Sequence, residues 1–340
     1  MIKESQYIKD VLEDLLLTPS PSGYSFDIMK KIKKYSQSLG IDYIDTQKGC
    51  GILTINGESD YTVGLSAHVD TLGAMVRSIN SSGTLRFTTI GGYTMHSIEG
   101  EYCKIHTRNG KTYTGTILSN HTSVHVFDDA KKQERKESNM EVRIDAQVES
   151  KEDVESLGIS VGDFISFDPR SQFLENGFIK SRHLDDKAGV AILLAYAKYI
   201  VDNNIKPKNN INIFISTYEE VGHGSSYIPK AIDELIAVDM GAMGDDLSCK
   251  ENQVSICAKD SSGPYDYHMV NRLIALAKEN AIDYAVDIYP NYGSDASAAL
   301  HAGHNIKCAL IGPGVHASHS MERTHIDGLL NTLNLLIKYL

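Results

Sequence analysis

The sequence predicts an α/β protein with a mixed sheet, interrupted by a smaller all-β insertion. Strand-like and helix-like segments alternate up to about residue 70 and again from about residue 180, which is typical of a sheet covered by helices on both faces. Between them, short β segments are separated by turn signals. We therefore expect an α/β domain formed by residues 1–70 and 180–340, and an inserted β domain over 71–179.

The elements follow from local patterns. The first seventeen residues place apolar side chains on one helical face and carry charges throughout, so they predict a helix and not a signal peptide. A second helix is expected over about 24–37, and strands over 51–55 and 62–67. In the insertion, Asn109-Gly110 is a two-residue hairpin signal. After residue 180, the strands "NINIFISTY", "ELIAVDM" and "KCALIGPG" alternate with helices, and a helix ends the chain.

Composition excludes several classes of function. The chain has 340 residues, 41% hydrophobic and 23% charged, with a net charge of -11. That charge argues against a nucleic-acid partner, and the apolar stretches are too short for a membrane span. Five scattered cysteines without a C-x-x-C pair indicate reduced thiols in a cytoplasmic protein. Any metal site must therefore use histidines and carboxylates.

Polar residues gather where the predicted strands end and where one helix begins. In open α/β sheets, sites form beyond the carboxyl ends of the strands. Each residue alone has an ordinary explanation: a solvated strand end for a Glu-Glu pair, a helix cap for Asp-Asp, a buried structural role for a histidine. Their coincidence at strand ends favours one site, formed by His68, Asp70, Asp185, Glu219, Glu220, Asp239 and His319.

This set of residue types suits divalent metal ions. Histidines and carboxylates without cysteine indicate Zn, Co or Mn. One catalytic zinc needs about three protein ligands, so a set of five fits two ions about 3.5–4 Å apart with one bridging carboxylate. Those five are His68, Asp185, Glu220, Asp239 and His319.

Two further carboxylates have different predicted tasks. Asp70, two residues after His68, can accept the second N–H of the imidazole. Neighbours on a strand point to opposite faces, so Glu219 and Glu220 should not share one role. We expect Glu220 to bind a metal and Glu219 to act as the general base that deprotonates water.

Together these stretches resemble metallopeptidase family forty-two, the TET-type glutamyl and deblocking aminopeptidases. The matching segments are in the family's order and span nearly the whole chain. They are "SPSGYS" (20–25), "SAHVDTLGAMV" (66–76), "LGISVGDFISF" (157–167), "HLDDKAGVAIL" (183–193), "STYEEVGHG" (216–224), "AVDM" (237–240), "NYGSDASA" (291–298) and "HASHSMERTH" (316–325).

The resemblance implies a phosphorylase/hydrolase-like di-metal exopeptidase domain with an inserted β-barrel-like domain. It implies that His68 and Asp239 hold one metal, that Glu220 and His319 hold the other, that Asp185 bridges them, and that Glu219 is the base. It also implies two zinc or cobalt ions per subunit, cytoplasmic location, and dimers that assemble through the insertion into tetrahedral dodecamers.

Two departures from the family pattern stand out. Lys187 takes the place of the usual Arg after the second Asp of the helix-opening motif. The C-terminal histidine motif of the family is usually preceded by an Arg-Tyr-type sequence, whereas this chain reads "GPGVHASHSMERTH". His316 therefore competes with His319 as the ligand, and a structural role is open for His325.

The predicted function is hydrolysis of the N-terminal residue of short peptides by water activated by two metals. An amidase or deacylase of N-acyl amino acids would use the same ligands and stays open as an alternative. An endoglucanase-type glycosidase would need two carboxylates and no metal. A non-enzymatic metal-binding scaffold would not need Glu219.

Overall fold

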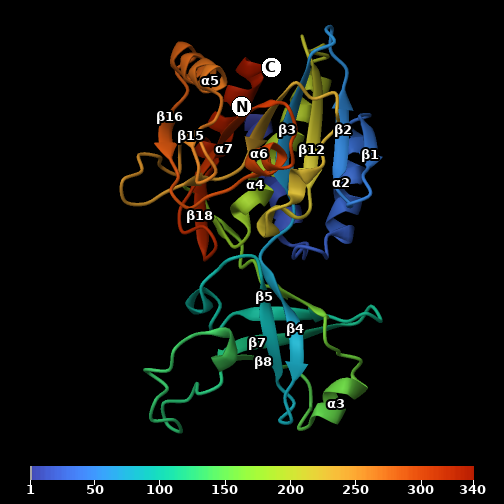
Figure 1. Cartoon of the computed structure of the whole chain (residues 1–340), viewed down its shortest axis with the longest axis vertical. Helices are drawn as coiled ribbons and strands as arrows, with labels where there is room; N and C mark the ends of the chain where they lie inside the picture. The colour runs from blue at the N-terminus through green and yellow to red at the C-terminus, as the bar shows by residue number, and fades with distance from the viewer. Residues whose placement is uncertain (1) are drawn as a thin grey trace. The chain divides into compact units, whose positions relative to one another are not determined.

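The computed structural model describes residues 2–340 (Figure 1). It divides into two units, residues up to 70 with 170–340, and residues 71–169. The predicted insertion extended to residue 179, whereas residues 170–179 group with the first unit. The reason is a long-range pairing, because β11 (Phe178–Ser181) lies antiparallel to β18 (Glu322–His325) near the C-terminus. Within 2–340, the helices all lack the length or the apolar character that crossing a membrane requires.

A nine-stranded mixed sheet forms the framework of the first unit, in the order β1-β2-β12-β3-β13-β17-β15-β16, with β14 also paired to β17. The parallel strands β12, β3, β13 and β17 form its centre. All seven residues of β3 are buried, as expected for a strand covered on both faces. The strands are β1 (Asp42–Asp45), β2 (Gly51–Ile55), β3 (Thr62–His68), β12 (Asn210–Ser216), β13 (Glu234–Val238), β14 (Gly241–Ala242), β15 (Val254–Lys259), β16 (Tyr284–Ile288) and β17 (Lys307–Val315).

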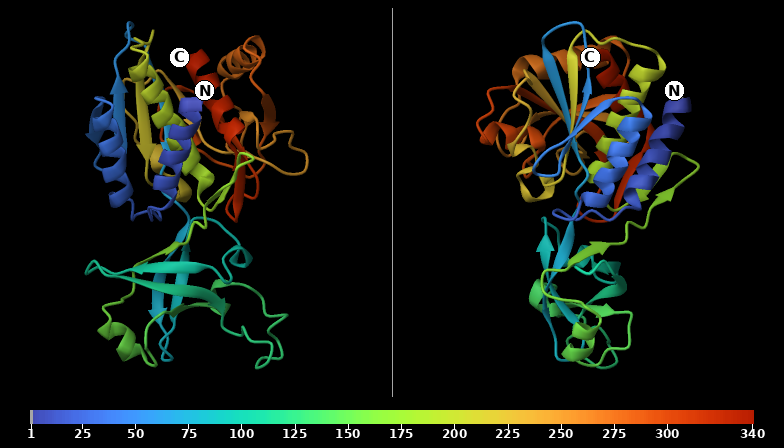
Figure 2. Two further views of the ribbon diagram at one scale, coloured as in Figure 1. Left: turned by 180° about the vertical axis from the view of Figure 1, so that it is seen from behind. Right: turned by 90° about the vertical axis from the view of Figure 1, so that its right-hand side faces the viewer.

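The helices of this unit pack on the sheet. α1, α4 and α7 lie together on one face (Figure 2). α4 is buried from Leu184 to Ala197 on all sides, which explains why its sequence is apolar without a polar stripe. The elements are α1 (Ile2–Leu16), α2 (Phe26–Ser38), α4 (Leu184–Asp202), α5 (Tyr267–Glu279), α6 (Asp295–His301) and α7 (Ile326–Tyr339), with the 3-10 turns η3 (Glu219–Val221) and η4 (Gly224–Ser226). A small sheet of β10 (Gln172–Phe173), β11 and β18 completes the unit.

The second unit is a closed barrel in the strand order β4-β5-β8-β7-β6-β9. The hairpin predicted at Asn109-Gly110 is confirmed, because β6 and β7 pair antiparallel from His106 opposite Thr112. Its turn is longer than the two residues expected, since Thr107 N–H bonds to the Lys111 carbonyl across it. Alternate side chains, such as Ile105, Val142 and Ile165, fill the interior. The elements are β4 (Gly73–Ile79), β5 (Leu85–Ile90), η1 (Met95–Ser97), β6 (Tyr102–His106), β7 (Thr112–Ser119), η2 (Glu137–Asn139), β8 (Met140–Ile144), α3 (Lys151–Ser156) and β9 (Phe164–Phe167).

Candidate active site

The sheet topology brings the predicted site residues to one edge. β12 and β13 flank β3 in parallel, so their carboxyl ends lie side by side. His68 is the last residue of β3 and pairs in register with Ser216 of β12. Glu219 and Glu220 follow in η3, and Asp239 comes directly after β13. Because neighbouring strands are about 4.8 Å apart, residues more than 150 positions apart in sequence meet here.

Asp185 lies between the two candidate histidines. Its Oδ1 atom is 3.1 Å from His68 Nε2, and its Oδ2 atom is 3.3 Å from His319 Nε2. The start of α4 is not regular helix: Asp185 has φ -75° and ψ 106°, and its peptide bond to Asp186 is cis. Asp186 points elsewhere, since its carboxylate accepts the N–H of His68 at 3.1 Å and of Gly189 at 3.2 Å. The two adjacent aspartates therefore have separate roles.

Three histidines follow β17, and their environments differ. His319 Nε2 lies 3.5 Å from Glu220 Oε2 and joins the cluster. His316 is exposed, and its backbone pairs with that of Arg323. His325 accepts the N–H of Asp327 at the start of α7, a helix-capping role. The geometry thus places His319, and not His316, beside Glu220.

Two overlapping groups of side chains have the geometry of a metal site. One is His68, Asp185 and Glu220, and the other is His68, Glu219 and Asp239. Within each group, one ligand atom per residue lies within 4.8 Å of the others. The side chains of His68 and Glu220 are 1% and 3% exposed, whereas that of His319 is 37% exposed. The cluster is therefore buried on the sheet side and open at His319.

The hydrogen bonds of His68 define which ring nitrogen faces the other site residues. Its Nδ1 atom lies 2.9 Å from the backbone carbonyl of Asp70. A carbonyl only accepts, so Nδ1 carries a proton, and Nε2 faces Asp185 and Glu219. A proton on Nε2 is donated to the Asp185 carboxylate, and a bound cation would take the place of that proton. The sequence prediction gave this contact to the Asp70 carboxylate, whose Oδ1 lies further away, at 3.5 Å.

The Asp70 carboxylate instead holds the turn that carries the two glutamates. It accepts the backbone N–H of Glu219 at 3.1 Å and of Glu220 at 3.3 Å. It also accepts the hydroxyl of Ser22. Asp70 therefore fixes η3 against β3 and positions both glutamates.

Burial shapes the electrostatics of the cluster. It raises the pKa of Glu219 and Glu220 well above the usual range, and raises that of Asp239 to about 7. Repulsion from Asp185 adds to the effect on Glu220 and Asp239. For Asp185 itself, hydrogen bonds from His319 and His68 outweigh burial and lower the pKa. Several buried acids close together are stabilised by a cation, and imidazole nitrogens with carboxylate oxygens suit a divalent one. The residues present therefore fit divalent metal ions.

Glu322 is a site residue to which the sequence analysis assigned no role. It is 2% exposed, and its carboxylate accepts the N–H of Asp185 and of His319, each at 3.1 Å. It thereby joins two segments 134 positions apart that both contribute to the cluster. The only local signal was its place three residues after His319.

Comparison with known proteins identifies the family. Residues 49–335 match the family model described as M42 glutamyl aminopeptidase. "Putative aminopeptidase YhfE" of Bacillus subtilis (strain 168) is 48% identical over 332 residues, which cover 97% of this chain and 96% of that protein. The chain belongs to the M42 glutamyl aminopeptidase family. It is an aminopeptidase, a hydrolase of peptide bonds, and membership of this metallopeptidase family implies divalent metal ions.

Solved structures show the same fold. The TET aminopeptidase from a marine sediment archaeon, Thaumarchaeota archaeon SCGC AB-539-E09, superposes with a TM-score of 0.90 at 20% identity, covering 98% of this chain and 96% of that one. The TET1 peptidase of Pyrococcus horikoshii superposes with a TM-score of 0.86 at 24% identity, covering 98% of both chains. The predicted α/β fold with an inserted barrel is confirmed. M42 membership favours the aminopeptidase function over the amidase and endoglucanase alternatives.

Proposed function

We propose that this M42 aminopeptidase removes the N-terminal residue of short peptides with two divalent ions per subunit, zinc or cobalt, with manganese as the third candidate. The observation that carries the proposal is the position of Asp185, which directs one carboxylate oxygen to His68 and the other to His319. A carboxylate that presents one oxygen toward each of two histidines is placed to be shared by two ions.

The ligands divide into two sets around this bridge. His68 and Asp239 would hold one ion, and Glu220 and His319 the other, with Asp185 shared. His68 offers Nε2, because its Nδ1 proton is engaged by the Asp70 carbonyl. When bound, such ions polarise the scissile carbonyl and lower the pKa of water.

Glu219 is the proposed base. Its side chain is 15% exposed, so it can reach a water molecule, and its Oε2 atom lies 3.6 Å from His68 Nε2. The carboxylate takes a proton from the attacking water as the new C–O bond forms. It then passes that proton to the leaving amine as the C–N bond breaks. Asp70 serves this step by fixing the backbone of η3.

The test compares three substrate series on the purified enzyme: aminoacyl-anilides, the same compounds with an acetylated α-amine, and N-acyl amino acids. We expect cleavage of the free-amine series only, loss of that cleavage with a chelator, and recovery with zinc or cobalt. Cleavage of the acetylated anilides or the N-acyl amino acids, with the free-amine series inert, would overturn the proposal in favour of an amidase.

The proposal extends to the assembly of the chain and to its location in the cell. The Pyrococcus horikoshii TET1 peptidase can assemble into a tetrahedron or a large octahedral shell. We infer that this chain forms dimers that build a tetrahedral dodecamer, with the insertion mediating assembly and limiting substrate access. Light scattering after size-exclusion chromatography should give the mass of twelve chains. All five cysteines are free and buried, which supports a reducing, cytoplasmic location.

A further inference from the structure

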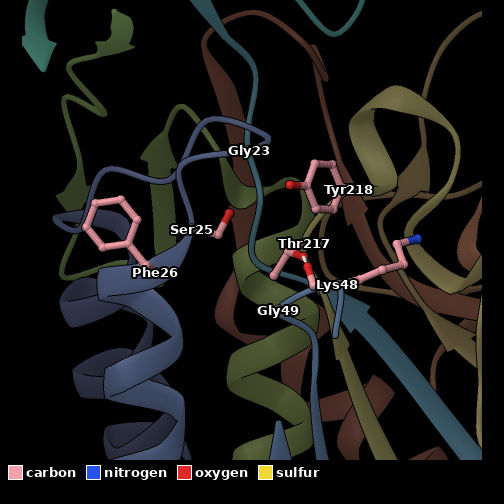
Figure 3. Close-up of a pocket in the computed structure, with 7 residues that line it drawn as sticks. All are labelled: Gly23, Ser25, Phe26, Lys48, Gly49, Thr217 and Tyr218. Atoms are coloured by element: carbon pink, nitrogen blue, oxygen red, sulfur yellow. Dashed lines mark hydrogen bonds between the residues drawn. The ribbon is translucent and has the colours of Figure 1, made fainter. Parts of the chain in front are cut away.

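A pocket of about 170 Å³ lies in the first unit, at the carboxyl end of β12 (Figure 3). Three short segments form its walls: the start of α2, the turn before β2, and the residues that follow β12. We call it the Ser25 pocket, and its walls include Gly23, Ser25, Phe26, Lys48, Thr217 and Tyr218.

Two connections link the pocket to the candidate active site: adjacency in sequence and a chain of hydrogen bonds. Tyr218 directly precedes Glu219. Ser22, three residues before Ser25, donates to the Asp70 carboxylate that also holds η3. Because β12 lies between β2 and β3, and strands are about 4.8 Å apart, the pocket lies on the order of 10 Å from His68. An extended peptide covers that distance in about three residues.

Ser25 carries a hydroxyl that the chain does not use. The residue is 7% exposed, and its Oγ atom has no hydrogen-bond partner within residues 2–340. It is the N-cap residue of α2, yet its side chain makes no capping bond. In Figure 3 the hydroxyls of Ser25 and Tyr218 are both turned toward the space between them. Most buried hydroxyls in folded proteins have a hydrogen-bond partner, so the Ser25 hydroxyl is available to a group that enters the pocket.

The remaining walls are mainly hydrocarbon. The Lys48 ammonium points away from the pocket (Figure 3), where it donates to Gly224 O at 3.0 Å and Ser226 Oγ at 2.9 Å. Phe26, Lys48 and Tyr218 contribute to the lining, and no carboxylate is among the lining residues. A cavity of about 150 Å³ holds one benzene ring. The pocket therefore suits one uncharged, apolar side chain.

We propose that the Ser25 pocket binds an apolar side chain of the peptide substrate, on the leaving-group side and within two residues of the scissile bond. Ser25 Oγ bonds to the backbone of that part of the peptide. The inference rests on the proposed function, because the leaving amine must lie beside Glu219 to receive its proton. The peptide that follows this amine then passes Tyr218, which forms the pocket wall.

The test measures kcat/KM for two tripeptide series whose first residue is the one preferred among aminoacyl-anilides. The second or the third residue is Gly, Leu, Phe or Glu. We expect wild type to prefer Leu or Phe over Gly by about tenfold or more at one of these positions, and to gain nothing from Glu.

Two variants then alter the pocket. Ser25→Val fills it without loss of a capping bond, and Tyr218→Ala removes one wall. Each should reduce the preference for Leu or Phe over Gly by about fivefold. The matched controls are Ser38→Val, exposed at the other end of α2, and Tyr267→Ala, which is 74% exposed. Both should keep the wild-type ratio.

The outcomes separate the two proposals. If wild type cleaves aminoacyl-anilides but shows no preference at the second or third residue, the pocket proposal is wrong and the proposed function stands. The same holds if both pocket variants keep the wild-type ratio. If wild type cleaves no substrate with a free α-amine, the proposed function fails, and the pocket proposal fails with it.

Discussion

Glu322 offers a demanding test of how the site is held together. Its carboxylate accepts two backbone N–H groups, those of Asp185 and His319, and it is 2% exposed. Glu322→Ala leaves both N–H groups buried and unpaired, at about 1–3 kcal/mol each. The variant also removes the repulsion between Glu322 and Asp185, which increases the free energy of unfolding and offsets part of this loss. We therefore expect the free energy of unfolding to fall by about 2–4 kcal/mol.

Glu322→Gln should fall between wild type and the alanine variant, because its one carbonyl oxygen can still accept one of the two bonds. The assay is urea unfolding of chelator-treated protein, with the exposed Glu58→Ala as control, expected within about 0.5 kcal/mol of wild type. Metal affinity should also fall about 10–100-fold, because Asp185 and His319 lose their support. A Glu322→Ala protein with the control's stability and wild-type metal affinity would refute this reasoning.

Three further predictions concern the core, the barrel and the metal. Phe214 is fully buried in β12, so Phe214→Ala should lower the free energy of unfolding by about 3–5 kcal/mol in the same assay. A loss under about 1 kcal/mol would contradict the packing described. In the barrel, hydrogen bonds from Arg135 lower the pKa of Glu99. The ionised Glu99 therefore stabilises the fold above pH 4.5, the ordinary pKa of a glutamate, and this contribution is lost as the pH falls below that value. Between about pH 5 and 3, wild type should lose more stability than Glu99→Gln. Equal losses would count against a stabilising Glu99–Arg135 interaction. Removal of bound metal by dialysis against a chelator should abolish aminoacyl-anilide cleavage, and zinc or cobalt should restore it; unchanged activity in metal-free protein would contradict the metal requirement.

The site residues at strand ends could be predicted from the sequence because the patterns that mark them are local. His68, Glu219 and Asp239 each follow a short apolar run, and α/β topology alone places such ends together. The same logic gave the strand at Gly51–Ile55 and the hairpin at Asn109-Gly110.

The remaining features depend on contacts between distant segments. The hydrogen bonds from Asp185 N–H to Glu322 and from the Ser22 hydroxyl to Asp70 join residues 137 and 48 positions apart. The periodicity of apolar residues within a segment does not predict a contact between two distant segments. The boundary at residue 170 likewise depends on β18 at the far end of the chain. The contact of His68 with the carbonyl of Asp70 depends on backbone geometry, to which side-chain identity gives no clue.

The measurement that tests the central claim most directly compares Glu219→Gln with Glu220→Gln, each assayed for kcat on an aminoacyl-anilide and for bound metal. Glu219→Gln should retain about two ions per chain and lose about 10²–10⁴-fold in kcat. Glu220→Gln should lose bound metal. If Glu219→Gln keeps wild-type kcat with two ions bound, Glu219 is not the base, and the division of roles between the two glutamates is wrong.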